Sequence, residues 1–192
     1  MCFKPAYGIL KQKEETVNIA RFRLFIWDRD GKKIPAQPLK ATRNDLETTL
    51  VEPVWQTNWT TDYITKSGFA IYALKTQIGE LVALDACEMG EDVLTVHIVY
   101  MESQAENNPT LSKKLKYRGI GWALIAYGIK LSVDAGFIGD VTLNAKTPEL
   151  AKHYERDFGA ILVLGRGNGA APRYLICDEV ARDVFTSYLE EG

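Results

Sequence analysis

The chain has 192 residues, of which 46% are hydrophobic and 25% are charged, so it is long enough to bury a sizeable core in one domain. A formal net charge of -2 and an isoelectric point near 5.8 argue against a protein that binds nucleic acid mainly through its phosphates. Three cysteines far apart in sequence, no long apolar run and no signal-peptide core at the N-terminus favour a cytoplasmic location and exclude a membrane span from the prediction.

The N-terminal third contains one clear strand signal. Val17–Trp27 is rich in β-branched, aromatic and aliphatic residues and ends in Asp28–Gly31, a pattern that predicts a strand followed by a turn. Pro35–Gly68 has no clean period, so we expect short helices and loops there, with Thr42 near a helix start. A partly aromatic wall is expected in this stretch from Trp55, Trp59 and Tyr63.

Three apolar runs follow, separated by turn-like residues: Phe69–Leu74, Leu81–Cys87 and Val93–Met101. This arrangement predicts an antiparallel meander. The next stretch, Glu102–Lys116, is too polar for a core and is expected to be a long loop with one turn of helix.

The C-terminal half alternates helices and strands. Ile120–Asp134 is apolar on nearly every side, which indicates a buried helix. A strand at Asp140–Ala145 is followed by a helix from Pro148 to Phe158, capped by Thr147. The remaining elements are expected to be strands at Ile161–Leu164 and Arg173–Cys177 and a helix at Glu179–Leu189. Strand, helix and strand in this order imply a parallel crossover, and hence a mixed α/β (α+β) fold.

The hexapeptide from Arg118 to Ala123 lies where the polar loop meets the buried helix. Its glycines, Gly119 and Gly121, allow a close approach of the backbone to an anion, and the first amides of the helix have no partners within it. These features are typical of a pyrophosphate-binding loop. The hexapeptide alone is a weak signal, because an ordinary helix start with glycines has the same pattern.

The surrounding elements add to this signal. With the meander before the hexapeptide and Ala151–Ala160 after it, the chain resembles the GNAT superfamily of N-acetyltransferases over roughly Gly68–Cys177. The resemblance implies a mixed, mostly antiparallel sheet of six to seven strands with helices on both faces. It also implies one acyltransferase domain over residues 1–192, divided into an irregular segment 1–67, a core 68–178 and a C-terminal helix 179–192. The activity implied is transfer of the acetyl group of acetyl-coenzyme A to a primary amine by direct attack.

The resemblance also assigns roles to residues. The family's R/Q-x-x-G-x-G/A loop is matched by Arg118, Gly121 and Ala123, which implies that the coenzyme pyrophosphate lies on the amides of Arg118, Gly119, Ile120, Gly121, Trp122 and Ala123. A backbone amide of the preceding strand, at Val99, Tyr100 or Met101, is expected to polarise the thioester oxygen. Asn144 is the candidate contact for the pantetheine arm, since Pro148 stands where many relatives carry asparagine. Lysines of the polar loop either meet coenzyme phosphates or are simply solvated: Lys113, Lys114 and Lys116.

Two side chains are candidates for proton transfer. Tyr154, with Ala151 before it, matches a family tyrosine that points at the coenzyme sulfur, so it is expected to protonate the leaving thiolate. The alternative for Tyr154 is simple packing of its helix onto the sheet. Glu102 is our first choice for the base that deprotonates the amine, with His97, Glu88 or a water molecule as alternatives.

Other functional readings are less well supported. With two histidines, no HExxH sequence and no cysteine cluster, we expect no metal, and Cys87 is expected in the core rather than as a nucleophile. A dinucleotide loop is ruled out because Leu124 stands where the third glycine is needed. A non-catalytic coenzyme A-binding module, a protein rather than a small-molecule amine as acceptor, and a homodimer all stay open.

Overall fold

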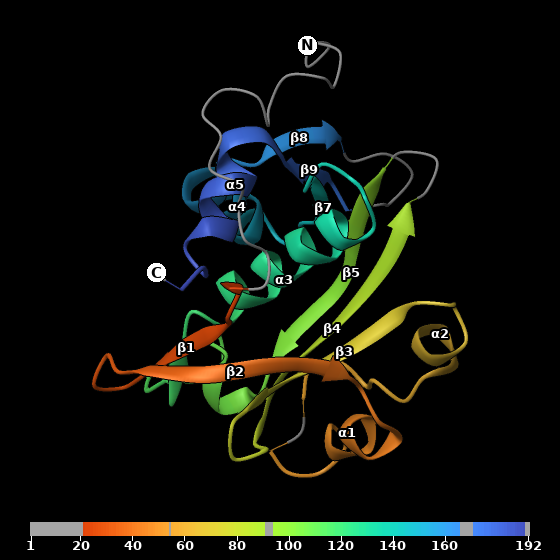
Figure 1. Ribbon diagram of the computed structural model, residues 1–192. Coiled ribbons are helices and arrows are strands. Elements are labelled where there is room, and N and C mark those ends of the chain that lie inside the picture. The colour runs from red at the N-terminus through yellow and green to blue at the C-terminus, as the bar shows by residue number, and fades with distance from the viewer. Residues whose placement is uncertain (1–20, 54, 91–93, 166–170, 191–192) are drawn as a thin grey trace.

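The computed structural model describes residues 21–53, 55–90, 94–165 and 171–190, and within them the strands join into one nine-stranded sheet. The order along the sheet is β6-β1-β2-β3-β4-β5-β7-β9-β8, and helices cover both of its faces (Figure 1). The strands are β1 (Phe25–Asp28), β2 (Lys33–Lys40), β3 (Ala70–Thr76), β4 (Leu81–Gly90), β5 (Thr95–Ser103), β6 (Tyr117–Arg118), β7 (Val141–Asn144), β8 (Ile161–Leu164) and β9 (Arg173–Ile176). The helices are α1 (Arg43–Thr48), α2 (Asp62–Thr65), α3 (Ile120–Asp134), α4 (Pro148–Phe158) and α5 (Asp178–Thr186), with a 3₁₀ turn at Ala105–Asn107.

The expected mixed, mostly antiparallel sheet is confirmed, but it has more strands than the six to seven predicted. The prediction of only helices and loops from Pro35 onward was wrong, because Lys33–Lys40 forms β2. The strand was not predicted because it contains two prolines, Pro35 and Pro38, which are unusual inside a strand. The half that holds Pro35 pairs only with β1, and the half that holds Pro38 pairs only with β3, so each proline has a neighbouring strand at one edge alone. The first strand also starts later than predicted, at Phe25, and residues 17–20 of that prediction lie outside the described residues.

The meander of β3, β4 and β5 is confirmed, with antiparallel pairing throughout. One irregularity interrupts it. Ala86 of β4 pairs with Tyr100, while its neighbour Cys87 pairs with Ile98, so Val99 is an extra residue on β5. A bulge of this kind bends the strand and leaves one residue outside the regular ladder.

A parallel pair lies beside the meander, one helix earlier in the chain than the crossover predicted from the strands at 140–145 and 161–164. β5 leads through α3 into β7, and the two strands pair in parallel over only three residues each, from Val96↔Val141 to Ile98↔Leu143. β7 and β8 also run in the same direction, but β9 lies between them and is antiparallel to both. α3 packs so closely on this region that a Cβ at Gly128 would lie 2.9 Å from Cδ1 of Ile98.

Local sequence explains where α4 begins and ends. The hydroxyl of Thr147 accepts a hydrogen bond from the amide of Leu150 at 3.2 Å, and Pro148 occupies the first turn, where no amide hydrogen is needed. The helix ends at Gly159, which adopts the left-handed conformation with φ 52°. This start and end agree with the prediction.

Two hydrophobic clusters lie on opposite faces of the curled sheet. The larger cluster packs α3, α4 and α5 against the sheet and includes Ile125, Phe158 and Phe185. The smaller one packs α1, α2 and the loop between them against β3 and β4, with Trp59 fully buried at its centre. In Figure 1 the long α3 and the short α1 and α2 accordingly lie on different sides of the meander.

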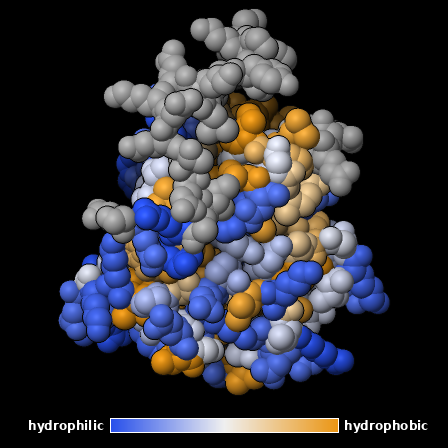
Figure 2. All heavy atoms as spheres, in the orientation of Figure 1, coloured by the Kyte–Doolittle hydropathy of each residue, from blue (hydrophilic) through white to orange (hydrophobic). Residues whose placement is uncertain are grey.

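The edge strand β8 is the most exposed apolar element. All four of its side chains, those of Ile161–Leu164, are about half exposed. Figure 2, in the view of Figure 1, shows hydrophobic atoms gathered in the upper part of the molecule, where Figure 1 places β8, while hydrophilic atoms dominate the lower part.

Asp85 is a charged residue in the middle of β4 that is completely buried. The thiol of Cys87 donates a hydrogen bond to Oδ2 of Asp85 at 3.4 Å, whereas Oδ1 has no partner among the described residues. Burial raises the pKa of the Asp85 carboxyl to about 7, because the charged form loses its hydration. Cys87 itself lies in the core, as its sequence context predicts.

This burial makes stability depend on pH. The unfolded chain releases the Asp85 proton near the ordinary pKa of 3.8, whereas the folded chain keeps it up to about pH 7. Asp85 therefore reduces the free energy of unfolding as pH rises through this window, by at most about 1.4 kcal/mol per pH unit. We expect Asp85→Asn to lose less stability than the wild type between about pH 5 and about pH 8 in urea unfolding. Parallel pH profiles for the two proteins would contradict this expectation.

Candidate active site

The loop predicted to bind pyrophosphate forms the N-terminus of α3. The first residue to close a helical hydrogen bond is Ala123, whose amide donates to the carbonyl of Gly119 at 3.0 Å. The amides of Ile120, Gly121 and Trp122 precede it and lie in the first turn, where no side chain caps the helix and no acidic residue occurs. These unpartnered donors and the positive end of the helix dipole make this turn suited to an anion. We call Arg118–Ala123 the cradle.

Gly119 is required for the shape of the cradle. It has φ 76° and ψ 9°, in the left-handed region, and a Cβ at this position would lie 2.3 Å from Cζ3 of Trp27. Trp27 lies on β1 directly opposite Arg118, because the two residues pair across β1 and β6. The hairpin of β1 and β2 therefore packs against the cradle through Trp27. Because the two segments are far apart in sequence, no local sequence pattern predicts this contact.

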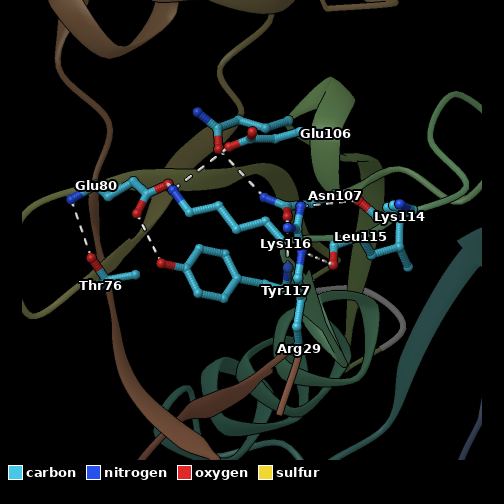
Figure 3. A network of polar contacts seen from close by, with 10 residues as sticks. Arg29, Thr76, Glu80, Glu106, Asn107, Lys114, Leu115, Lys116 and Tyr117 are labelled. Carbon is cyan, nitrogen blue, oxygen red and sulfur yellow. Dashed lines mark hydrogen bonds and ion pairs between the residues drawn. The ribbon is translucent and has the colours of Figure 1, made fainter. Parts of the chain in front are cut away.

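A polar network fixes the chain just before the cradle (Figure 3). The carboxylate of Glu80, at the start of β4, binds Lys116 Nζ at 2.5 Å and accepts a hydrogen bond from the Tyr117 hydroxyl at 2.9 Å. The amide of Tyr117 donates to Oδ1 of the buried Asn107 at 2.9 Å, and Arg29 donates to the carbonyl of Leu115 at 3.1 Å. Lys116 therefore pairs with Glu80 rather than projecting freely toward a phosphate, whereas Lys113 and Lys114 are exposed.

The second part of the site is the gap that opens where β5 and β7 stop pairing, after Ile98 and Leu143. Val99, Tyr100 and Met101 continue along β5 beyond this point with no β7 residue opposite them. The bulge at Val99 turns Met101 toward the larger cluster and Tyr100 toward the smaller one. Backbone groups on the open side of β5 thereby face the gap, where a ligand can pair with them.

Tyr154 lies on α4, a helix that contacts both the edge of the gap and the cradle. Tyr154 is only 3% exposed, and its ring contacts the ring of Tyr174 with 6.2 Å between centroids. Tyr174 pairs with Leu143, at the edge of the gap. One turn further along α4, Phe158 packs on Trp122 of the cradle, with centroids 4.4 Å apart. Burial raises the pKa of the Tyr154 phenol to about 12, so it stays protonated at neutral pH.

Glu102 reaches the smaller cluster rather than open solvent. Its carboxylate accepts hydrogen bonds from the backbone amides of Gln56 at 2.6 Å and Thr57 at 3.1 Å, and from the indole of Trp59 at 3.1 Å. These partners come from the loop between α1 and α2. Glu102 therefore anchors this loop to β5, a role that sequence reasoning did not foresee.

The remaining candidates are less open to a ligand. Oδ1 of Asn144 accepts a hydrogen bond from Nε of Arg173 at 3.3 Å, its partner across β7 and β9. His97 is buried, and its Nδ1 lies 3.0 Å from the hydroxyl of Thr142; burial, followed by the charge of Arg173, lowers its pKa. Glu88 is exposed near the far end of β4, where it pairs with His97.

An aromatic surface lies on the α1 and α2 side of the gap. Tyr100 contacts Tyr63 edge to face at 6.1 Å and Trp59 at 6.4 Å, and Tyr63 contacts Phe69 at 6.3 Å. Lys146, two residues after β7, holds its Nζ 4.3 Å above the Tyr100 ring. We call Trp59, Tyr63, Phe69, Tyr100 and Lys146 the aromatic wall. Of the three residues from which the sequence predicts an aromatic wall, Trp59 and Tyr63 make these contacts, whereas Trp55 is buried in the smaller cluster. The place of Lys146 was not predicted.

A hollow beside the wall does not belong to the cradle. It has a volume of about 570 Å³ and lies between α1 and the start of the α2 region, lined by Arg43, Leu46, Glu47, Leu50, Thr60 and Thr65. We place the candidate site at the gap instead, because β5 has no β7 partner there and because Phe158, one turn from Tyr154 on α4, contacts Trp122 of the cradle.

Two further properties concern the described residues. Within them, no three side chains of His, Cys, Asp or Glu come together in a way that would hold a metal ion. None of the helices in the same ranges is long and apolar enough to cross a membrane.

Comparison with known proteins identifies the fold. No family model matches the sequence, and no curated protein matches it. Solved structures do match. A GNAT-family acetyltransferase from Listeria monocytogenes has 11% identity and a TM-score of 0.50, covering 79% of this chain and 98% of its own. An uncharacterised protein from Bacillus halodurans has 9% identity and a TM-score of 0.55, covering 88% and 96%. A variant of the spermidine N-acetyltransferase SpeG from Vibrio cholerae has 12% identity and a TM-score of 0.50, covering 77% and 96%. At these identities the likeness concerns the fold, which is that of the GNAT acetyltransferases.

The two glycines of the cradle provide a matched pair of variants. We expect Gly119→Ala to lower the free energy of unfolding by about 2–4 kcal/mol, because the new methyl meets Trp27 in a left-handed backbone conformation. Gly121→Ala should leave stability unchanged or slightly higher, since no atom lies within 4 Å of its Cβ position and alanine favours the helix. Urea unfolding of both variants measures the difference, and equal stabilities would show that Trp27 does not constrain the cradle.

Proposed function

We propose that this chain, which has the fold of the GNAT acetyltransferases, is an N-acetyltransferase that uses acetyl-coenzyme A and a primary amine. The observation that carries the proposal is the uncapped N-terminus of α3 beside the gap between β5 and β7. A long ligand with a pyrophosphate at one place and an acyl group further along matches these two features. Acetyl-coenzyme A supplies the activated thioester, whose acyl carbon gains a bond to the amine nitrogen and loses its bond to sulfur.

The cradle and the gap hold the coenzyme in this proposal. The amides of Arg118, Gly119, Ile120, Gly121, Trp122 and Ala123 surround the pyrophosphate, and the helix dipole adds to the attraction. A backbone amide at Val99, Tyr100 or Met101 donates to the thioester oxygen as negative charge develops on it. Asn144 keeps its Nδ2 for the pantetheine arm, since Oδ1 is taken by Arg173.

Tyr154 acts as the general acid. The leaving thiolate needs a proton, and a buried phenol with a pKa of about 12 is reliably protonated at neutral pH. Its burial also keeps competing water away from the sulfur. The packing alternative is supported by the same burial, so only a kinetic measurement separates the two roles.

The amine must lose its proton to a base. Glu102 was our first choice from the sequence, but three donors of the loop between α1 and α2 already occupy its carboxylate. We therefore favour Glu102 as a positioning residue that holds the acceptor side in place, with a water molecule receiving the proton. Its role as base stays a prediction, as do the weaker candidates His97 and Glu88.

Other readings make different predictions. A non-catalytic module would bind coenzyme A without releasing thiol from acetyl-coenzyme A, whatever amine is offered. A protein acceptor would require turnover with peptides that small amines do not match. Cytoplasmic location and a homodimer also stay predictions.

Thiol release from acetyl-coenzyme A tests the proposal. We expect the wild type to release thiol with at least one amine from a panel of small amines and peptides. Tyr154→Phe should lower kcat by about 100-fold or more with little change in affinity for acetyl-coenzyme A. Tyr174→Phe is the matched control, because it keeps the ring and loses only a hydroxyl that binds Glu155 on the outer side of α4. Failure of the wild type to bind acetyl-coenzyme A would overturn the function, whereas full activity of Tyr154→Phe would overturn only the acid assignment.

A second variant separates the two roles of Glu102. If Glu102 positions the loop, Glu102→Gln should lower the free energy of unfolding by about 1–3 kcal/mol and raise KM for the amine, with kcat within about tenfold of the wild type. If Glu102 is the base, kcat should fall by about 100-fold or more with little loss of stability. Glu47→Gln on the exposed face of α1 is the control for loss of a surface charge.

A further inference from the structure

The charge of the aromatic wall indicates what kind of amine it accepts. Lys146 follows β7 beyond the point where that strand stops pairing with β5, and its ammonium group lies over the ring of Tyr100, in the part of β5 that β7 does not pair with. Lys146 forms no ion pair within the described ranges. An ammonium group is thus held at the opening of the site without a counter-ion.

The nearest acidic group does not fill this role. Glu102 attracts Lys146 over a distance, but the two form no ion pair, and the carboxylate is bound to the amides of Gln56 and Thr57 and to the indole of Trp59. Partial loss of hydration beside the Tyr100 ring lowers the pKa of the Lys146 ammonium, and the charge of Glu102 offsets part of this effect. A cation that has lost part of its hydration gains from an anion brought by a ligand.

The aromatic rings define the neighbouring surface. Tyr63 is 63% exposed and meets Phe69 and Tyr100 edge to face, so an exposed aromatic ring lies beside the Tyr100 ring that carries the ammonium. Aromatic faces of this kind bind apolar or aromatic groups by stacking. A second positive charge on the ligand would be repelled by Lys146 at this place.

We propose that the acceptor is an amine that carries a carboxylate close to its nitrogen and an apolar side chain, that is, an amino acid or a compound with the same groups. Lys146 binds the carboxylate, and the rings of Tyr63, Phe69 and Tyr100 take the side chain. The free amine between them faces the gap. This inference rests on the proposed acetyl transfer and disfavours polyamines such as spermidine as acceptors.

The test compares acceptors that differ in one group. Phenylalanine, 2-phenylethylamine and spermidine are offered with acetyl-coenzyme A, and thiol release gives kcat/KM for each. We expect phenylalanine to exceed 2-phenylethylamine, which lacks the carboxylate, by about tenfold or more. Lys146→Met should abolish this preference by lowering kcat/KM for phenylalanine to about the value for 2-phenylethylamine. Lys33→Met is the matched control, because Lys33 makes the same kind of contact, 4.2 Å above Phe25, on the hairpin of β1 and β2.

Each outcome decides the inference. A carboxylate preference that Lys146→Met removes and Lys33→Met keeps supports it. Acetylation of 2-phenylethylamine or spermidine at least as fast as of phenylalanine overturns it and leaves the acetyltransferase function standing. A carboxylate preference that is unchanged in Lys146→Met also overturns the inference and leaves the acetyltransferase function standing. Binding of acetyl-coenzyme A without acetylation of any of the three also overturns the acceptor class, whereas no binding of acetyl-coenzyme A overturns the function itself.

Discussion

The early end of the pairing between β5 and β7 is the constraint on which the site depends. Two parallel strands that kept their ladder would fill the space that a coenzyme needs, and their backbone groups would bind only each other. Here the ladder stops at Ile98 and Leu143, and the extra residue Val99 bends β5 away from it. The backbone beyond this point has hydrogen-bonding groups on one edge that no strand satisfies, so a ligand in the gap has partners ready for it.

Each face of the sheet then supplies one half of the site. On one face the larger cluster fixes α3 and α4, and the contact between Trp122 and Phe158 holds the cradle close to the helix that carries Tyr154. On the other face the smaller cluster fixes the loop between α1 and α2, and Glu102 connects that loop to β5. The two halves lie on opposite faces of the sheet, on either side of the place where β5 and β7 stop pairing.

Local patterns predicted most of the scaffold. The buried α3, the capped start of α4 and the meander follow from periodicity and cap residues within a few positions of one another. β2 was missed because its two prolines are compatible with a strand only when each half has a neighbour on one side, which is a property of the whole sheet. The cradle could be predicted because its glycines are close together in sequence, but its contact with Trp27 could not, since about ninety residues of chain separate Trp27 from Gly119. For the same reason, the sequence could not predict the hydrogen bonds of Glu102 or the position of Lys146 above Tyr100. Both are contacts between residues that are far apart in sequence.

In the proposed function, the first amides of α3 bind the pyrophosphate of coenzyme A. Amide NMR spectra of isotope-labelled protein, recorded while coenzyme A is added, test this most directly. We expect the largest shifts on the amides of Ile120, Gly121 and Trp122, with further shifts at Val99, Tyr100 and Met101 along the gap. Saturable binding that leaves the three helix amides unshifted, or the absence of binding, would contradict it.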